Sequence, residues 1–195
     1  RLDSLGVDLI EAGFPSSNPK EAELFELLAG APLNHAEIVA FGMTRRRDRT
    51  PDNDDGLNVL AASIAPIVTL VGKSSMLHVE KVVRVSPEEN LAMISESIAF
   101  LVGQGKRVLF DAEHFFDGWR GDPQYAIETL RAAAEAGSER VVLCDTNGGS
   151  LPSQVTAAVA EVRDALPGVL IGIHTHDDAG CAVANSLVAI DAGAT

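Results

Sequence analysis

The segment that decides the fold is Leu170-Ile171-Gly172-Ile173-His174-Thr175-His176-Asp177-Asp178. In it, an apolar run typical of a β-strand ends in two histidines and two carboxylates. Side chains alternate between the faces of an extended chain, so His174 and His176 are expected on one side, about 7 Å apart along the strand. Two imidazoles on a rigid element, beside carboxylates, suit a divalent metal ion. Alternatively, both are solvated or hydrogen-bonded residues at a strand end, and the surrounding sequence must decide.

The composition restricts the class of protein. The chain has 195 residues, of which 46% are hydrophobic, enough for one sizeable core. It has no apolar run near the ~20 residues that span a bilayer and no recognisable signal peptide. The formal net charge of −13 argues against nucleic acid or an anionic membrane as a partner. Cys144 and Cys181 lie in apolar settings and are expected to be buried free thiols, so we predict a cytoplasmic globular protein.

Apolar strands and helices alternate along the chain. After a helix end at 1–5, strands are predicted at 7–14, 38–44, 67–72, 108–113, 141–145 and from 170 to the histidines. Helices are predicted at 19–29, 52–63, 86–102, 122–137, 152–166 and 179–191. Asn18, Pro19 and Glu21 form a capping-box pattern at the start of the first full helix. A polar loop is expected from Lys73.

The alternation predicts the fold class. Strands that are apolar throughout and alternate with helices indicate a parallel sheet covered on both faces. Their spacing fits the ~31 residues per unit of an eightfold βα barrel. A doubly wound sheet also fits, but no Gly-x-Gly-x-x-Gly follows the first strand. We therefore predict one domain, residues 1–195, forming an incomplete TIM (β/α)8 barrel with about six units and the first and last strands missing. The pattern leaves open whether the natural polypeptide is also short.

Polar side chains follow each predicted strand, where the catalytic groups of a parallel barrel lie. Glu11 and Glu113 stand out because carboxylates within or directly ending apolar strands are costly to bury. The alternative for each is a buried hydrogen bond to a neighbouring strand. The full set is Glu11, Thr44, Arg45, Lys73, Ser74, Ser75, Asp111, Glu113, His114, Asp145, Thr146, Asn147, His174, His176 and Asp177.

Six segments together resemble the isopropylmalate/homocitrate synthase family, and within it the citramalate synthase branch. The resemblance covers nearly the whole chain in the right order. The branch assignment depends mainly on Glu113–Gly118 and Asn147–Gly149. The segments are Ile10–Pro15, Phe41–Arg46, Leu77–Val79, Phe110–Gly118, Cys144–Gly149 and Gly172–Ser186.

The resemblance implies an acyltransferase that condenses acetyl-CoA with a 2-oxo acid and then hydrolyses the thioester. The branch implies pyruvate as the 2-oxo acid, citramalate as the product and a role in isoleucine and leucine biosynthesis. It also implies a divalent metal ion (Mg²⁺, Mn²⁺ or Zn²⁺) that polarises the keto group, and a homodimeric full-length enzyme.

The resemblance also assigns roles to residues. His174 and His176 correspond to metal ligands, Glu113 to a catalytic substrate-site carboxylate and Thr146 to a hydroxyl donor. Asp111 is expected near the substrate and to contribute to selection of the 2-oxo acid. Thr44 and Glu11 are further substrate-binding candidates at the strand ends.

Several family features are absent from the sequence. The first-strand motif with its Asp ligand and Arg, the asparagine-bearing motif after the eighth strand and the regulatory domain are not found. Asp177 stands where the family often has Asn. With two histidines alone, we expect weak metal affinity for the 195-residue chain.

Arg45, Arg46, Arg47 and Arg49 form the one basic concentration of an acidic protein. The simplest interpretation is a solvated loop. The functional alternative is that Arg45 or a neighbour binds an anionic substrate group or a CoA phosphate.

Three other functions are left open. The first is an isopropylmalate or homocitrate synthase, or a lyase like HMG-CoA lyase, which pocket size around Asp111 would discriminate. The second is a metal-dependent hydrolase, disfavoured because its His-x-His pair lies on the first strand. The third is an inactive fragment that needs a partner chain, because an open barrel exposes sheet edges.

Overall fold

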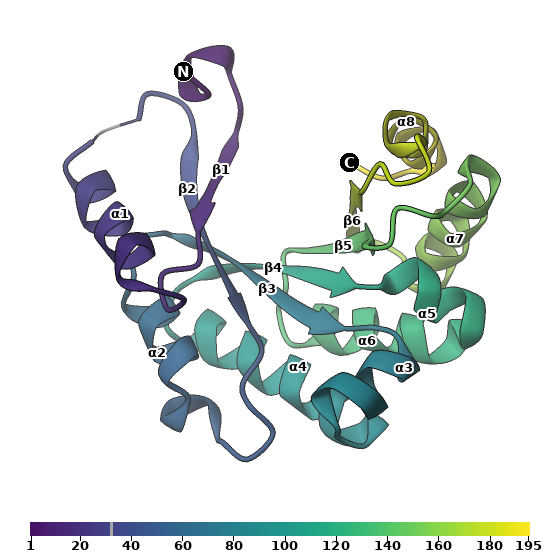
Figure 1. Ribbon diagram of the computed structural model, residues 1–195, viewed down its shortest axis with the longest axis horizontal. Coiled ribbons are helices and arrows are strands. Elements are labelled where there is room, and N and C mark those ends of the chain that lie inside the picture. The colour runs from purple at the N-terminus through teal and green to yellow at the C-terminus, as the bar shows by residue number, and fades with distance from the viewer. Residues whose placement is uncertain (32) are drawn as a thin grey trace.

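The computed structural model describes residues 1–31 and 33–195, which form a curled sheet of six parallel strands (Figure 1). Each strand pairs with the next one in sequence, so spatial order follows chain order. The strands are β1 (Leu9–Gly13), β2 (Glu37–Met43), β3 (Ile67–Lys73), β4 (Arg107–Glu113), β5 (Arg140–Asp145) and β6 (Leu170–Thr175).

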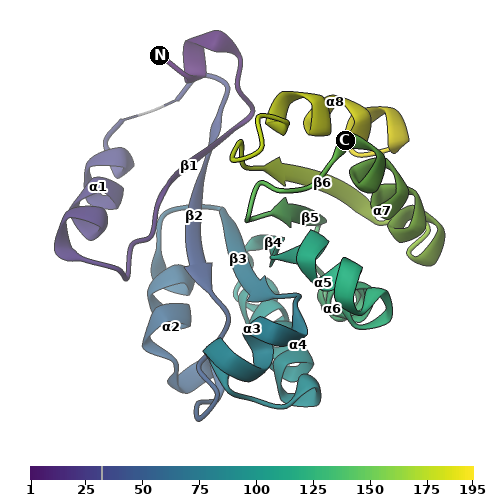
Figure 2. The ribbon, with the colours of Figure 1, turned by 45° about the vertical axis from the view of Figure 1, so that its right-hand side comes forward.

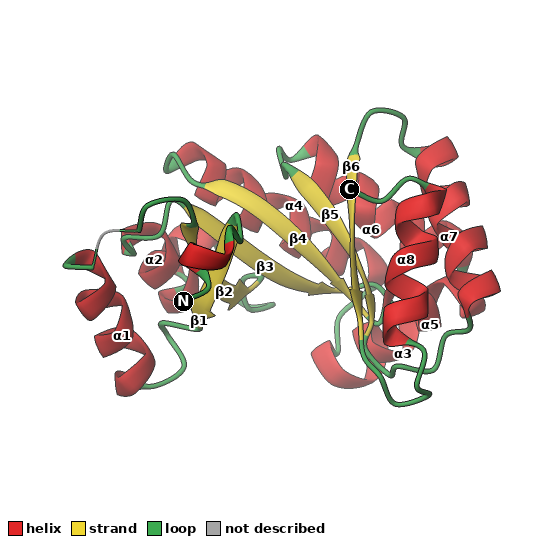
Figure 3. Ribbon diagram, turned by 90° about the horizontal axis from the view of Figure 1, so that it is seen from above, coloured by secondary structure: helices red, strands yellow, loops and turns green. Residues whose placement is uncertain are grey.

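Helices cover the outer side of this sheet, which curls like part of a barrel (Figure 3). Strands β1 and β6 form its two edges and do not pair with each other within the described residues (Figure 2). The parallel α/β half-barrel confirms the predicted fold class. The α-helices are α1 (Pro19–Ala29), α2 (Asp55–Ala62), α3 (Met76–His78), α4 (Pro87–Gly103), α5 (Phe115–Gly121), α6 (Pro123–Glu135), α7 (Pro152–Ala165) and α8 (Ala182–Ala192). None of the helices described is both long and apolar enough to cross a bilayer.

Most predicted helix starts are confirmed by their caps. The Asn18 carboxamide accepts hydrogen bonds from the first turn of α1, as do the side chains of Ser86 and Asp122 at α4 and α6. The capping-box role of Glu21 is wrong. Its Oε2 instead accepts the backbone N–H of Phe14 at 3.2 Å, so it fastens the loop after β1 to α1.

Short helical segments account for the main differences from the predicted elements. The first residues form only a 3₁₀ turn, Asp3–Leu5, and another lies at Pro51–Asn53 before α2. The loop expected from Lys73 contains α3 and a π-helical turn, Val79–Val83.

Helix α5 was not predicted because two glycines interrupt its sequence. A Cβ on Gly118 would lie 2.0 Å from the carbonyl oxygen of Ser74, so only glycine permits this close approach of α5 to the chain after β3. Phe115 and Phe116 are buried beside it and hold the short helix through tertiary packing.

Alternate strand residues face two different environments. One set packs with the helices in the main core and includes the fully buried Leu70, Phe110 and Leu143. The other set faces the concave side, where Val39, Ile67, Leu109 and Leu9 form a separate small cluster near the amino ends of the strands. Polar side chains occupy the same face further along the strands.

Candidate active site

Three side chains from neighbouring strands meet on the concave face near the carboxyl ends. Ligand atoms of Asp111 on β4, Cys144 on β5 and His174 on β6 all lie within 4.8 Å of one another. The registers bring them together, since Asp111 pairs with Val142 and Cys144 pairs with His174. Asp111 and His174 were predicted as site residues. Cys144 and Cys181 were predicted only as buried free thiols, which is confirmed for Cys144, whereas Cys181 is only partly buried.

The charges in this triad are coupled. Oδ2 of Asp111 lies 3.9 Å from Nδ1 of His174, and this carboxylate raises the pKa of His174 although burial opposes the effect. Burial raises the pKa of Cys144 well above its ordinary value, and the charges of Asp111, Glu113 and Glu11 add to it. The site is therefore rich in negative charge and holds Cys144 as a neutral thiol.

His176 lies beside His174 but just beyond the end of β6. The ring centroids are 5.0 Å apart in an edge-on arrangement. The about 7 Å expected from the sequence is a different quantity, the spacing of the two residues along an ideal strand. The backbone N–H of His176 donates to the carbonyl of Asp145 at 3.3 Å, which ties the turn to β5. His176 does not join Asp111 and His174 in a group of ligand atoms within 4.8 Å of one another. The two imidazoles and the Asp111 carboxylate are nonetheless nitrogen and oxygen donors of the types that bind Mn²⁺, Zn²⁺ or Mg²⁺, so their chemistry fits a divalent ion.

Glu113 ends β4 and forms an ion pair with Lys73, which ends β3. The two residues are partners in the strand register. Both side chains are largely buried, with exposed fractions of 26% and 13%. The sequence placed both residues at strand ends but did not reveal that they pair.

Thr146 and His114 connect the ends of β5 and β4. The backbone N–H of His114 donates to Oγ1 of Thr146 at 2.8 Å. Among the described residues, no protein acceptor is found for the hydroxyl proton of Thr146, so that proton is available to a bound molecule.

The ring of His114 is fixed on both sides. It stacks on His78 with a centroid separation of 3.7 Å and an interplanar angle of 9°. Its Nδ1 lies 3.2 Å from Oδ2 of Asp117, which also accepts from Asn147 at 2.6 Å. Its backbone is left-handed, at φ 59°. Burial and the nearby His114 lower the pKa of His78, so an additional proton on His78 is unfavourable.

Glu11 and Thr44 lie at the ends of the first two strands. Desolvation raises the pKa of Glu11, while a hydrogen bond with Thr69 lowers it and the charge of Asp111 raises it further. The backbone N–H of Thr44 donates to the carbonyl of Val71 at 3.3 Å. Glu11 thus faces the triad, whereas Thr44 lines a neighbouring cavity.

Arg45 is buried rather than solvated, so the solvated-loop interpretation is wrong for this residue. Its guanidinium donates to Glu89 and Glu96, both at 2.7 Å. Arg46 and Arg47 are exposed, as that interpretation predicted. The donors of Arg45 are engaged within the protein, which leaves its neighbours better placed to meet an anion.

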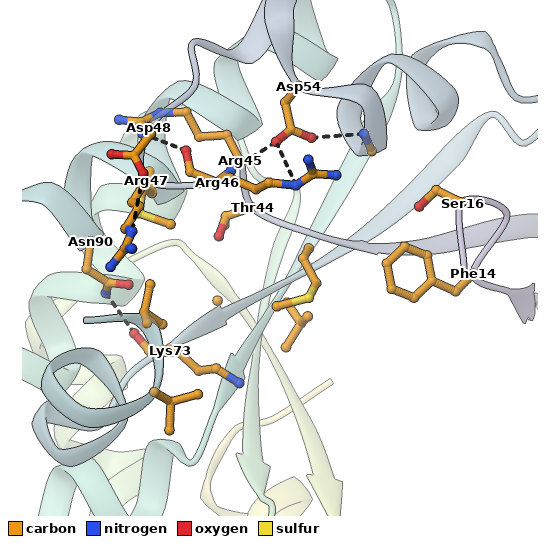
Figure 4. A pocket seen from close by; sticks show the side chains of 17 residues that line it. Phe14, Ser16, Thr44, Arg45, Arg46, Arg47, Asp48, Asp54, Lys73 and Asn90 are labelled. Atoms are coloured by element: carbon orange, nitrogen blue, oxygen red, sulfur yellow. Dashed lines mark hydrogen bonds and ion pairs between the residues drawn. The ribbon is translucent and has the colours of Figure 1, made fainter. Parts of the chain in front are cut away.

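A cavity of about 580 Å³ opens at the ends of β1 to β3 (Figure 4). Its wall combines apolar side chains with the exposed Arg46 and Arg47. Lys73 is part of the lining and also pairs with Glu113, so the cavity adjoins the polar strand ends. The remaining lining includes Phe14, Met43, Thr44, Val71, Val82, Val83 and Met93.

Comparison with known proteins gives relatives along the whole chain. It is 49% identical over 195 residues to an (R)-citramalate synthase of Streptomyces coelicolor, covering 100% of this chain and 36% of that protein. It is 36% identical over 193 residues to homocitrate synthase AksA of Methanopyrus kandleri, covering 99% of this chain and 45% of that protein. The chain thus spans less than half the length of these relatives.

A solved structure of hydroxymethylglutaryl-CoA lyase from Pseudomonas aeruginosa has the same fold. The TM-score is 0.78 at 21% identity, covering 99% of this chain and 63% of that one. The family profile described as HMGL-like matches residues 1–195. With the whole chain matched, the protein belongs to the HMGL-like family.

Proposed function

We propose that these residues form part of the active site of an acyltransferase that condenses acetyl-CoA with pyruvate and hydrolyses the thioester to give citramalate. The observation that carries the proposal is the pattern of identity. Five (R)-citramalate synthases are 42% to 49% identical to the chain, whereas homocitrate and isopropylmalate synthases are 34% to 36% identical. The polar strand ends supply groups that suit this chemistry.

His174 and His176 would hold a divalent metal ion, with the Asp111 carboxylate beside them. Such an ion, when bound, supplies a Lewis acid that polarises the keto group of a 2-oxo acid. Asp111 orients the His174 ring through the 3.9 Å approach to Nδ1. The negative charge of the triad attracts the cation. The bound cation would then offset this charge, so that an anionic substrate could bind beside it.

Thr146 would bind the carboxylate of the 2-oxo acid. Its oxygen already accepts the His114 N–H, which leaves the hydroxyl proton to donate to a bound molecule. A hydrogen bond to a charged group contributes ~1.5–3 kcal/mol, enough to fix one end of a small substrate. The stacked ring of His114 holds this backbone segment in place.

Glu113 would act at the reacting carbon atoms. The reaction removes a proton from the methyl group of the acetyl thioester, and the resulting carbon nucleophile forms the new bond to the keto carbon. The ion pair with Lys73 fixes the direction of the Glu113 side chain. A carboxylate held in this way is suited to accept that proton.

The cavity of about 580 Å³ would receive acetyl-CoA. Its apolar wall suits a pantetheine chain, and Arg46 and Arg47 at its mouth suit phosphate groups. Because Lys73 lies between this cavity and Glu113, a thioester in the cavity would end near the proposed acid/base group. The substrate-binding role predicted for Arg45 thereby passes to its exposed neighbours.

Steady-state kinetics of a full-length enzyme carrying this sequence test the proposal. Release of CoA is measured with acetyl-CoA and one of three acceptors: pyruvate, 3-methyl-2-oxobutanoate or 2-oxoglutarate. We expect the highest kcat/KM with pyruvate and citramalate as the product. A preference for either larger acid would assign an isopropylmalate or homocitrate synthase, and no CoA release with any acceptor would contradict the proposal.

A further inference from the structure

We propose that Asp111, Cys144 and His174 form a binding site for a thiophilic divalent cation such as Zn²⁺ or Cd²⁺. This site lies deeper than the position between the two histidines and shares His174 with it. Binding at this site is a property of the triad itself. Its effect on catalysis rests on the function proposed above.

The geometry of the triad fits a small ion. Three atoms at most 4.8 Å apart leave an ion at their centre about 2.8 Å or less from each of them. Side-chain movements of under about 1 Å then reach the ~2.0–2.3 Å bonds that zinc forms with sulfur, nitrogen and oxygen. The three side chains come from adjacent strands whose backbones are joined by the sheet, so no large rearrangement is needed.

The surroundings favour a cation that binds sulfur. Cys144 is only 5% exposed, and among the described residues its thiol donates just one weak hydrogen bond, to the carbonyl of Val142 at 3.7 Å. Glu11, Asp111 and Glu113 all act on this thiol electrostatically. They oppose a bare thiolate but stabilise a cation bonded to it.

The chemical step is a simple exchange. The S–H bond of Cys144 breaks, its proton leaves to solvent buffer, and sulfur donates an electron pair to the ion. Soft ions such as Cd²⁺ and Zn²⁺ form such bonds, whereas Mg²⁺ and Mn²⁺ prefer oxygen and nitrogen donors. The triad should therefore bind Cd²⁺ and Zn²⁺ in preference to Mg²⁺ and Mn²⁺.

Sharing His174 makes the two positions mutually exclusive. An ion in the triad draws the imidazole and the Asp111 carboxylate inward, and the ring is then lost to the outer position beside His176. Under the proposed function, Cd²⁺ should inhibit an enzyme activated by Mg²⁺ or Mn²⁺.

Cobalt absorption spectroscopy tests the site directly. Co²⁺ is titrated into the reduced full-length protein, and the thiolate-to-cobalt charge-transfer band is recorded. We expect the band in the wild type and in Cys181→Ser, a matched control because Cys181 lies outside the triad. Cys144→Ser should abolish it. No band in the wild type, or an unchanged band in Cys144→Ser, would overturn the inference.

Two further measurements keep the test decisive. If Cys144→Ser does not fold, Asp111→Asn retains the thiol and should weaken Co²⁺ binding at least tenfold, and unchanged binding would count against the site. In CoA-release assays with Mg²⁺, Cys144→Ser should raise the Cd²⁺ concentration for half inhibition at least tenfold. The absorption band does not depend on turnover, so its presence in an enzyme that forms no citramalate would sink only the proposed function.

Discussion

At the amino ends of the strands, the concave face carries apolar side chains such as Ile67 and Leu109. At the carboxyl ends, the same face carries Asp111, Cys144 and His174 within 4.8 Å of one another. Both layers lie on the same parallel sheet and share β4, so backbone geometry does not distinguish them. The first layer gains stability by excluding water. The second gives up part of that stability in order to place polar groups beside a cavity.

An arginine clamp reinforces the amino end. Arg107 donates to Glu37 at 2.6 Å and to Glu139 at 2.7 and 2.9 Å, which joins the starts of β2 and β4 and the residue before β5. These carboxylates raise the pKa of Arg107. At this end Arg107 and the nearby Arg140 balance the two carboxylates, whereas the negative charge at the carboxyl end is only partly balanced. Mutations at the two ends should therefore affect different properties.

Replacing Glu113 by Gln should have the largest effect. We expect kcat to fall by ~10²–10⁴-fold in a full-length enzyme, because the amide cannot accept the proton. Steady-state kinetics with saturating acetyl-CoA and pyruvate measure this loss. Denaturant unfolding serves as the control and should show the cooperative transition of a folded protein. A kcat within threefold of wild type would remove Glu113 from the chemistry.

Ile67→Ala should show the opposite behaviour at the amino end. Ile67 is fully buried, and truncating such a side chain costs about 2–5 kcal/mol in the free energy of unfolding. Denaturant titration followed by Trp119, the single tryptophan, reports this loss. The kcat of the remaining folded enzyme should be unchanged. A strong decrease in kcat without loss of stability would contradict the separation of the two ends.

Tyr125 tests how helices α4 and α6 support the carboxyl ends of the strands. The Asn90 side chain bridges the Lys73 carbonyl and the Tyr125 hydroxyl, both at 2.9 Å. Burial raises the pKa of Tyr125 to about 12 from 10.0. The neutral phenol is thus favoured in the folded state, and this stability is complete below pH 10.0 and is lost as pH rises towards about 12.

The expected loss is on the order of 2 kcal/mol across that pH window and should be missing in Tyr125→Phe. Because Tyr125 is the single tyrosine of these 195 residues, tyrosinate absorbance of the 195-residue chain follows its ionisation directly. A transition at pH 10.0 in the folded protein would contradict the described environment.

Thr146→Val should have the smallest effect. Without the hydroxyl, the KM for pyruvate should rise about tenfold, since the lost hydrogen bond reaches a charged carboxylate. The KM for acetyl-CoA should stay near its wild-type value. Thr146→Ser, which keeps the hydroxyl, is the matched control and should restore the KM for pyruvate. An equal rise for both substrates would point to a general distortion of the loop.

Much of the fold could be predicted because its signals are local. Apolar runs marked all six strands, and Asn18, Ser86 and Asp122 marked the helix starts. Helix α5 escaped prediction because it depends on contact with Ser74, a residue distant in sequence. The role of Glu21 was wrong for a related reason, since the loop after β1 competes for its carboxylate.

The candidate site was predicted less completely because it depends on strand register. Alternation along one strand placed His174, but only the pairing between strands brings Cys144 to it. Asp145, which follows Cys144 on β5, points to the opposite face of the sheet. It is buried, and its carboxylate accepts hydrogen bonds from Ser150. Likewise, the partners of Arg45 lie on α4, about fifty residues away in sequence.

The most direct test asks which side chains bind metal ion and substrate together. We predict that they are the polar side chains at the carboxyl ends of the strands and not the apolar side chains at the amino ends. Mn²⁺ is titrated into a full-length enzyme with and without pyruvate, and free Mn²⁺ is followed by electron paramagnetic resonance. We predict that pyruvate tightens Mn²⁺ binding in the wild type and in Ile67→Ala, and that His174→Ala removes both the binding and the pyruvate effect. Wild-type Mn²⁺ binding in His174→Ala, with pyruvate still tightening it, would contradict the account.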